Sequence, residues 1–142
     1  MILVFVEHRD GKIRKGSFEV LSVAGKLGLG ETHAVIVGKD VKSLGESLKD
    51  WADIIHCVEN PLLENYSTTA FKKVIFEIVK RTNPDAILFS ASSLGKDLAP
   101  RVTASLGSSI ASDCTNIRVE NGKLIATRPI YAGKAFLEIE LR

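Results

Sequence analysis

The stretch FSASSLGKDLAPRVTASLG, residues 89–107, connects the end of an apolar run to a segment with helical periodicity through a loop of small residues. The apolar residues that follow the loop recur at steps of four: Leu98, Val102 and Leu106. They predict a helix over residues 96–106 that Gly107 terminates. Pro100 then falls near the helix start, where a missing N–H group costs least. A strand, a short loop and a helix in this order form one unit of an α/β fold.

The same unit is repeated along the first three quarters of the chain. Four apolar runs are typical of parallel strands covered on both faces: Met1–Glu7, THAVIVG from Thr32, DIIHCVE from Asp53 and DAILFSA from Asp85. The segments between them have helical periodicity. Their predicted first residues are Ser17 for a helix near 17–27, Asp40 for a second helix, and Ser67 or Thr68 for a third that ends at Asn83-Pro84.

From residue 113 onward the apolar residues alternate with polar ones, and Asn121-Gly122 separates two strand-like runs. This is a strong hairpin signal, and a second turn follows at residues 132–134. The whole pattern predicts a single α/β domain over residues 1–142. We expect a doubly wound, mainly parallel sheet with flanking helices, extended at an edge by antiparallel hairpin strands from the C-terminal end.

The composition excludes several classes of protein. The net charge of +2 is too small to indicate a nucleic-acid-binding protein. A basic cluster is interrupted by the turn-like pair Asp10-Gly11 and reads as a solvated loop: Arg9, Lys12, Arg14 and Lys15. No apolar run approaches the roughly 20 residues that span a bilayer, and the first run lacks the features of a leader. Cys57 and Cys114 lie far apart and are expected to be buried, reduced thiols.

Ligands of open α/β sheets bind at the carboxyl ends of the strands, and the small-residue loop quoted above is one such place. It is not a P-loop, because Ser90 stands where the motif needs its first glycine and Asp97 where it needs a hydroxyl group. No G-x-G-x-x-G fingerprint follows a strand either. Two interpretations of Ser92, Ser93 and Gly95 stay open. They bind an anion at the helix N-terminus, or Ser93 simply caps the helix and Gly95 relieves crowding.

No catalytic constellation is visible, and the sequence predicts a protein that is not an enzyme. The hydrolase motif G-x-S-x-G is absent. Three histidines lie beside strand ends without an evident acid partner: His8, His33 and His56. Three carboxylates could be combined into an acidic site, although each is more simply a structural or surface residue: Glu7, Asp53 and Asp113. Neither cysteine has a second ligand at metal-binding spacing, so we expect no metal site.

Three segments together resemble one family: ILVFVEHRDGKIRKGSFEVLSVA from Ile2, FSASSLGKDLAPRVTASLGSSIASDC from Phe89 and ATRPIYAGKA from Ala126. They are similar to the N-terminal domain of electron transfer flavoprotein alpha subunits. The resemblance covers essentially the whole chain and implies a fold of the adenine nucleotide alpha hydrolase-like group. Enzymes of that group handle ATP with an S-G-G-x-D loop. The corresponding SASSLGKD of this chain departs from that loop, which argues against ATP cleavage.

The resemblance also implies cofactors and partners. Alpha subunits pair with a beta subunit that holds AMP, and FAD is held chiefly by a C-terminal alpha domain, which this chain lacks. No cofactor is therefore expected on this chain alone. The complex carries electrons from flavin dehydrogenases to a quinone oxidoreductase or similar acceptor, in bacterial or archaeal cytoplasm or in the mitochondrial matrix. Arg101, Arg128 and Tyr131 are interface candidates, with a packing or surface role as the alternative. A stand-alone adenine-nucleotide-binding module is the alternative function.

Overall fold

The computed structural model describes residues 1–107, 116–121, 123–130 and 135–141. Its centre is a four-stranded sheet made of β1 (Ile2–Val6), β4 (Thr32–Gly38), β5 (Ile54–Glu59) and β6 (Ala86–Leu88). The strand order is β5-β4-β1-β6, and every neighbouring pair is parallel. The chain winds outward from β1 to β5 and then returns to place β6 on the other side of β1. The doubly wound parallel fold predicted from the sequence is confirmed.

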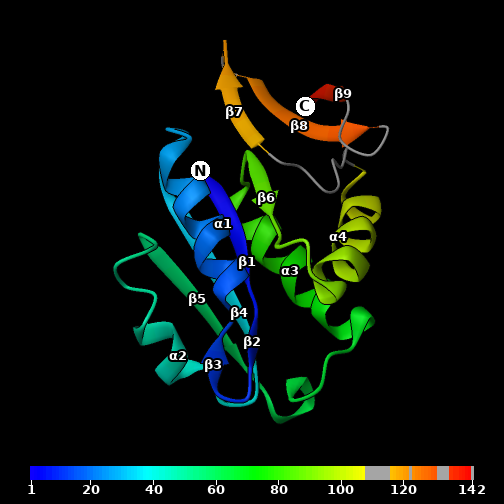
Figure 1. Cartoon of the computed structure of the whole chain (residues 1–142). Coiled ribbons are helices and arrows are strands. Elements are labelled where there is room, and N and C mark those ends of the chain that lie inside the picture. The colour runs from blue at the N-terminus through cyan, green and yellow to red at the C-terminus, as the bar shows by residue number, and fades with distance from the viewer. Residues whose placement is uncertain (108–115, 122, 131–134, 142) are drawn as a thin grey trace.

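Helices cover both faces of this sheet (Figure 1). They are α1 (Lys15–Lys26), α2 (Lys42–Glu46), α3 (Thr68–Thr82) and α4 (Ser93–Leu106). The side chains of β1 alternate between two apolar cores, because successive residues of a strand point to opposite faces. Ile2, Val4 and Val6 pack in one core with α1 and the α2 region. Leu3 and Phe5 pack in the other with α3 and α4.

Two predicted helix starts are wrong, for the same physical reason. Ser17 lies inside α1, where its buried hydroxyl group accepts a hydrogen bond of 2.8 Å from the backbone N–H of Glu7. Asp40 does not cap α2. The backbone N–H groups of residues 41 and 42 instead donate to Glu59 Oε1 at 3.1 and 2.8 Å. In both cases a residue far away in the sequence makes the bond: Glu7 occupies the Ser17 hydroxyl group, and Glu59 accepts from the N–H groups that Asp40 was expected to cap.

The third helix begins and ends as predicted. Ser67 caps α3 by accepting from the backbone N–H of Ala70 at 3.4 Å, and Asn83 takes the left-handed conformation that ends it, with φ 48°. The start of α4 was predicted three residues too late. Pro100 consequently lies in the interior of α4, where its nitrogen cannot donate to a carbonyl group one turn earlier.

The structure contains two smaller sheets. β2 (His8–Arg9) and β3 (Lys12–Ile13) form a short hairpin whose turn, Asp10-Gly11, has positive φ at both residues. β7 (Asn116–Glu120), β8 (Lys123–Ile130) and β9 (Ala135–Leu141) form an antiparallel sheet. The predicted hairpin strands are confirmed, but they make a separate sheet and do not extend the parallel one. Among the helices that the structure describes, none has the length and apolar character needed to cross a bilayer.

Candidate functional site

The place to search for a ligand is the crevice between β1 and β6. β4 pairs with one side of β1 and β6 pairs with the other side. The direction in which successive strands are added to the sheet therefore reverses at β1. Open α/β sheets bind ligands at this reversal, outside the carboxyl ends of the strands. The residues at that position are Glu7 after β1 and the loop of residues 89–92 between β6 and α4.

A buried contact closes this crevice. Glu7 is 4% exposed, and the hydroxyl group of Ser92 donates a hydrogen bond to its Oε1. The same Ser92 oxygen accepts from the backbone N–H of Gly95 at 3.1 Å, and the Ser92 carbonyl accepts from the N–H of Lys96 at 2.9 Å. Ser92 is therefore the cap of α4, and the predicted cap Ser93 is only the exposed first residue of the helix.

Two glycines let the chain close tightly around this contact. A Cβ atom on Gly95 would collide with the carbonyl oxygen of Ser90, so Gly95 does relieve crowding as the sequence indicated. A Cβ atom on Gly16, at the start of α1, would lie 2.7 Å from the Ser90 Oγ. The backbone of β1 is also tied to α1, because the N–H of Arg14 donates to the Glu7 carbonyl at 2.9 Å. These contacts bring the chain segments at the crevice close together.

The space that remains beside the crevice is small. A cavity of about 80 Å³ is lined by Glu7, His8, Glu64 and Tyr66 together with apolar side chains. Pockets that hold cofactors and drug-sized ligands measure roughly 300–1,000 Å³. A few water molecules fit, but neither an adenine nucleotide nor a flavin does.

One wall of this cavity is held by a group of hydrogen bonds at Asp97. The hydroxyl groups of Tyr66 and Thr68 each donate to Asp97 Oδ2 at 2.7 Å, and Arg101 lies 3.7 Å from Oδ1. The bonds from Thr68 and then Tyr66 lower the pKa of Asp97. The Asp97 carboxylate therefore fastens the start of α3 and the residues just before it to α4.

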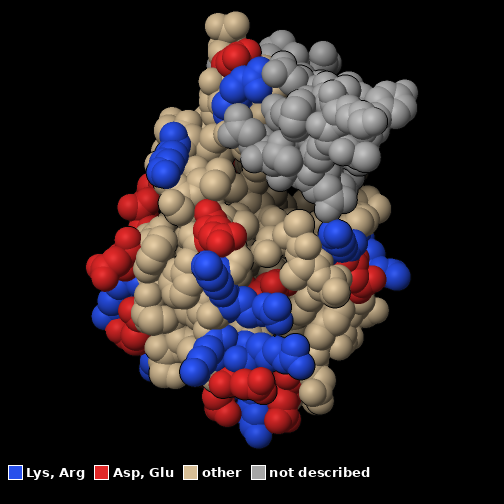
Figure 2. Space-filling view, in the orientation of Figure 1, with Lys and Arg blue, Asp and Glu red and all other residues tan. Residues whose placement is uncertain are grey.

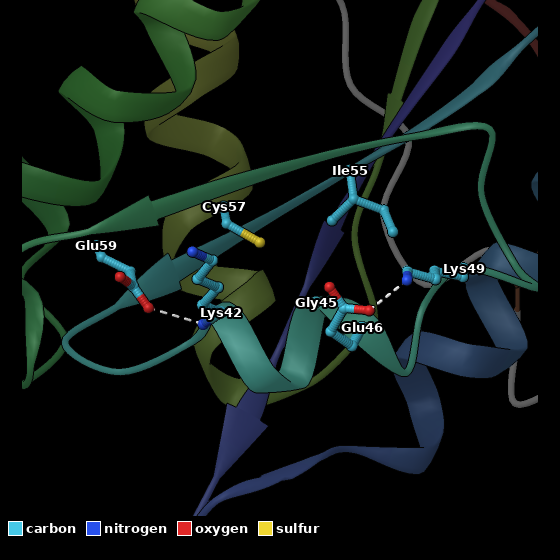
Figure 3. Close-up of a pocket in the computed structure, with 7 residues that line it drawn as sticks. All are labelled: Lys42, Gly45, Glu46, Lys49, Ile55, Cys57 and Glu59. Carbon is cyan, nitrogen blue, oxygen red and sulfur yellow. Dashed lines mark hydrogen bonds and ion pairs between the residues drawn. The ribbon is translucent and has the colours of Figure 1, made fainter.

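A larger hollow of about 490 Å³ lies between α2 and β5 (Figure 3). It is an open trough, and its lining has no aromatic ring on which adenine or flavin could stack. The carboxylate of Glu59 already bonds the start of α2, and that of Glu46 pairs with Lys49. The trough is thus a surface between two structural elements.

Cys57 is part of the same trough and corrects a prediction. It is exposed, although the sequence indicated a buried thiol. The reason is that β5 is an edge strand, so one side of it faces solvent. The residue as a whole is exposed, but its sulfur atom lies close to Gly45 of α2, and this partial burial, followed by the nearby Glu59, raises the pKa of the Cys57 thiol. Cys114 lies outside the described residues.

The three histidines lie at two separate places in the fold. His8 Nε2 lies 2.8 Å from the carbonyl oxygen of Val37, which anchors the β2–β3 hairpin to β4. His33 Nδ1 and His56 Nε2 lie 3.0 Å apart on neighbouring strands. His33 also has Glu31 at 3.8 Å, so the expectation of no acid partner is wrong for it. Burial and then His33 lower the pKa of His56.

The carboxylates considered from the sequence are not brought together. Glu7 follows β1 at the carboxyl edge of the sheet, whereas Asp53 precedes β5 at the opposite edge and accepts from the N–H of Thr32 at 2.8 Å. Asp113 lies outside the described residues. Among the residues that are described, no group of three or more His, Cys, Asp or Glu side chains could hold a metal ion.

Of the three interface candidates, the structure describes the side chain of Arg101 alone. Arg101 is exposed on α4. Arg128 lies in β8, next to Leu137 of β9 in the register, while its side chain and the whole of Tyr131 lie outside the described part.

In Figure 2, Lys and Arg side chains gather where Figure 1 shows β2 and β3, with Asp and Glu directly below them. This mixed surface is unlike the continuous basic stripe of nucleic-acid-binding proteins.

Comparisons with known proteins give the family. The model of the electron transfer flavoprotein domain matches residues 2–141. The chain is 38% identical to the electron transfer flavoprotein subunit alpha of Thermoanaerobacterium thermosaccharolyticum, over 98% of this chain and 44% of that protein. It is 40% identical to that of Syntrophomonas wolfei, over 97% of this chain and 44% of the relative. It is 34% identical to the electron transfer flavoprotein subunit alpha of Bacillus subtilis, over 95% of this chain and 42% of that protein.

The chain therefore spans less than half the length of these relatives. The resemblance stated from the sequence is confirmed, both by the family match and by relatives that are named alpha subunits. The α/β fold and the match over nearly all residues agree with each other. The chain belongs to the electron transfer flavoprotein domain family, and the relatives it matches are alpha subunits.

Proposed function

We propose that residues 1–142 are the N-terminal scaffold domain of an electron transfer flavoprotein alpha subunit. In this role the domain docks a partner subunit and positions the redox centre but carries no redox group itself. The observation that supports this proposal is the crevice between β1 and β6. The fold offers a ligand site there, yet Glu7 and Ser92 are hydrogen-bonded to each other at this position, and the cavity beside Glu7 measures about 80 Å³.

The cofactors and partners follow from this role. FAD binds to the assembled complex through parts of the alpha subunit outside residues 1–142, and AMP binds to the beta subunit. The complex takes electrons from flavin dehydrogenases and passes them to a quinone oxidoreductase or a similar acceptor. Because the relatives named above are bacterial, we place the protein in a bacterial cytoplasm.

The beta subunit is the proposed direct partner, and Arg101, Arg128 and Tyr131 are the proposed contact residues. A stable interface between subunits buries on the order of 1,600 Å² or more in total. Arg101 is exposed, and its ion pair with Asp97 is long at 3.7 Å. Its guanidinium group is thus available to a partner. Arginine is enriched among the residues that dominate the binding energy of interfaces.

Analytical ultracentrifugation of the chain with the beta subunit tests the docking. We expect one heavier species at micromolar concentration, and weaker association for Arg101→Glu. The control is Arg9→Glu, which makes the same charge change on the β2–β3 hairpin. Absence of any association at micromolar concentration would refute the docking role. Equal weakening by the two substitutions would remove Arg101 from the interface.

Calorimetry distinguishes the scaffold from the alternative, a stand-alone adenine-nucleotide-binding module. The scaffold predicts no heat of binding when AMP, ATP or FAD is added to the chain. Submillimolar binding of AMP or ATP would favour the module. A preparation that retains stoichiometric flavin would contradict both, because neither places the isoalloxazine ring on these residues.

A further inference from the structure

A pair of histidines joins the edge strand of the parallel sheet to its neighbour. Among the described strands, β5 pairs with β4 alone, whereas β4 and β1 each have a strand on both sides. His33 Nδ1 of β4 and His56 Nε2 of β5 lie 3.0 Å apart, and the centroids of the two rings are 5.2 Å apart. One of these nitrogens therefore donates a hydrogen bond and the other accepts it. The bond adds a side-chain link to the backbone pairing of the two strands.

The surroundings of His33 are unfavourable for a positive charge. Its side chain is buried, and its second nitrogen, Nε2, has no hydrogen-bond partner in the described part of the chain. The carboxylate of Glu31, just before β4, lies 3.8 Å from Nε2, which is too far for a hydrogen bond. On the other side, Leu3 of β1 is the neighbour in register and is apolar. A second hydrogen on this ring would thus be poorly solvated.

His56 lies in a similar setting on the same face of the sheet. Its neighbour in register on β4 is the apolar Val35, and Arg81 of α3 is the charged residue that acts on it from the helix layer. Burial, then His33 and then Arg81 lower the pKa of His56. Asp53, which precedes β5, is bound to the N–H of Thr32. The closed pair therefore resists protonation on both of its rings.

The hydrogen bond also limits how many protons the pair can take up. Two neutral imidazole rings have four nitrogens and two hydrogens, and one hydrogen lies in the bond between them. A third hydrogen can be added to an outer nitrogen and leaves the bond intact. A fourth would place N–H groups on both facing nitrogens, and two cations with centres 5.2 Å apart repel each other. The closed pair thus takes up at most one proton, whereas two separated rings take up two.

We propose that His33 and His56 form a pH-sensitive latch, which holds β5 on β4 at neutral pH and releases this edge strand in acid. Below the ordinary histidine pKa of 6.5, the open state binds about one proton more than the closed state, or two more where the closed pair stays neutral. The ratio of open to closed molecules then rises about tenfold or more from pH 6 to pH 5. The latch goes beyond the scaffold role and does not depend on it, because neither docking nor cofactor binding enters the argument.

Hydrogen exchange of the backbone amides tests the latch. Mass spectrometry of the chain between pH 8 and pH 5 gives the protection of residues 54–59, after division by the intrinsic exchange rate at each pH. Carboxyl groups ordinarily titrate near pH 4, below this range. The test variant carries His33→Gln and His56→Gln together, since glutamine takes up no proton. The matched control is His8→Gln, because His8 bonds the carbonyl group of Val37 on β4 but has no bond to β5.

We expect the protection of β5 in the wild type and in His8→Gln to fall about tenfold or more from pH 6 to pH 5. At pH 5, β5 should also be at least tenfold less protected than β1, which has a strand on each side. The double variant should show no such dependence on pH. A fall of less than about threefold in the wild type would overturn the proposal. Equal protection of β5 and β1 would overturn it too, because the strand would then separate only when the whole protein unfolds.

A second measurement needs no variant, so the proposal can be tested even where the double variant does not fold. The ¹⁵N NMR shifts of the imidazole rings report how many protons the pair holds in the wild type. We expect one ring to remain neutral at pH 5 in molecules whose β5 amides are still protected. Two cationic rings in such molecules would show that the closed pair accepts both protons, and the latch would be wrong.

Discussion

Replacing Gly95 by alanine should destabilise the protein, although alanine is the better helix former. In a helix interior, alanine is favoured over glycine by about 1 kcal/mol. Against this gain, the new Cβ atom would collide with the carbonyl oxygen of Ser90, which is backbone and cannot rotate away. Overpacking of this kind costs typically 1–3 kcal/mol and occasionally more, and a collision with backbone belongs at the upper end. We expect a net loss of about 2 kcal/mol.

Gly25→Ala is the matched control, because Gly25 lies in α1 and a Cβ atom added to it would meet nothing within 4 Å. It should stabilise the protein by about 0.5 kcal/mol through helix propensity. Urea unfolding followed by far-ultraviolet circular dichroism gives both changes as shifts of the midpoint at constant slope. Opposite shifts of the two variants are the expected result. A Gly95→Ala protein as stable as the wild type would refute the close packing of the loop against α4.

Three further predictions concern other hydrogen bonds of the fold. Ser92→Ala should lower the free energy of unfolding by about 2–4 kcal/mol, because it removes a helix cap and the donor to a buried carboxylate together, whereas Ser93→Ala should change it by less than about 0.5 kcal/mol in the same urea assay. The pKa of His56 is lowered from 6.5 by burial and by His33, so stability is fully present above pH 6.5 and falls as the unfolded state takes up a proton below it; His56→Gln should flatten this part of the profile. The pKa of Asp97 is also lowered, so its contribution is present above 3.8 and lost as the pH falls further; Asp97→Asn should speed proteolysis of residues 60–67 at neutral pH.

The parts of the fold that could be predicted depend on local signals. The strands β1 and β4 were visible because buried parallel strands are continuous apolar runs, and both are buried along their whole length, whereas β5 is an apolar run that lies at the exposed edge. The helix α3 was predicted at both ends, since Ser67 bonds a residue three positions later and Asn83 adopts its left-handed conformation without outside help. Local sequence did not predict that the C-terminal strands form their own sheet. Which strands pair with one another depends on contacts between segments that are far apart in the sequence, and no short segment contains that information.

The sequence named Glu7, Ser92 and Gly95 as candidates but could not show how they pair, because each pairing depends on a distant partner. Ser92 and Ser93 are equally good caps by residue type, and Glu7, 85 positions away, decides between them by accepting the Ser92 hydroxyl. Glu59 bonds the start of α2 in place of Asp40 for the same reason. A free N–H group at a helix start can be satisfied by any acceptor that the sheet brings near it. At the carboxyl edge of a parallel sheet, such acceptors come from the residue that follows a strand. An acidic residue directly after a buried strand is therefore the useful signal, and Glu7, which the sequence analysis considered only as part of an acidic site, has that position.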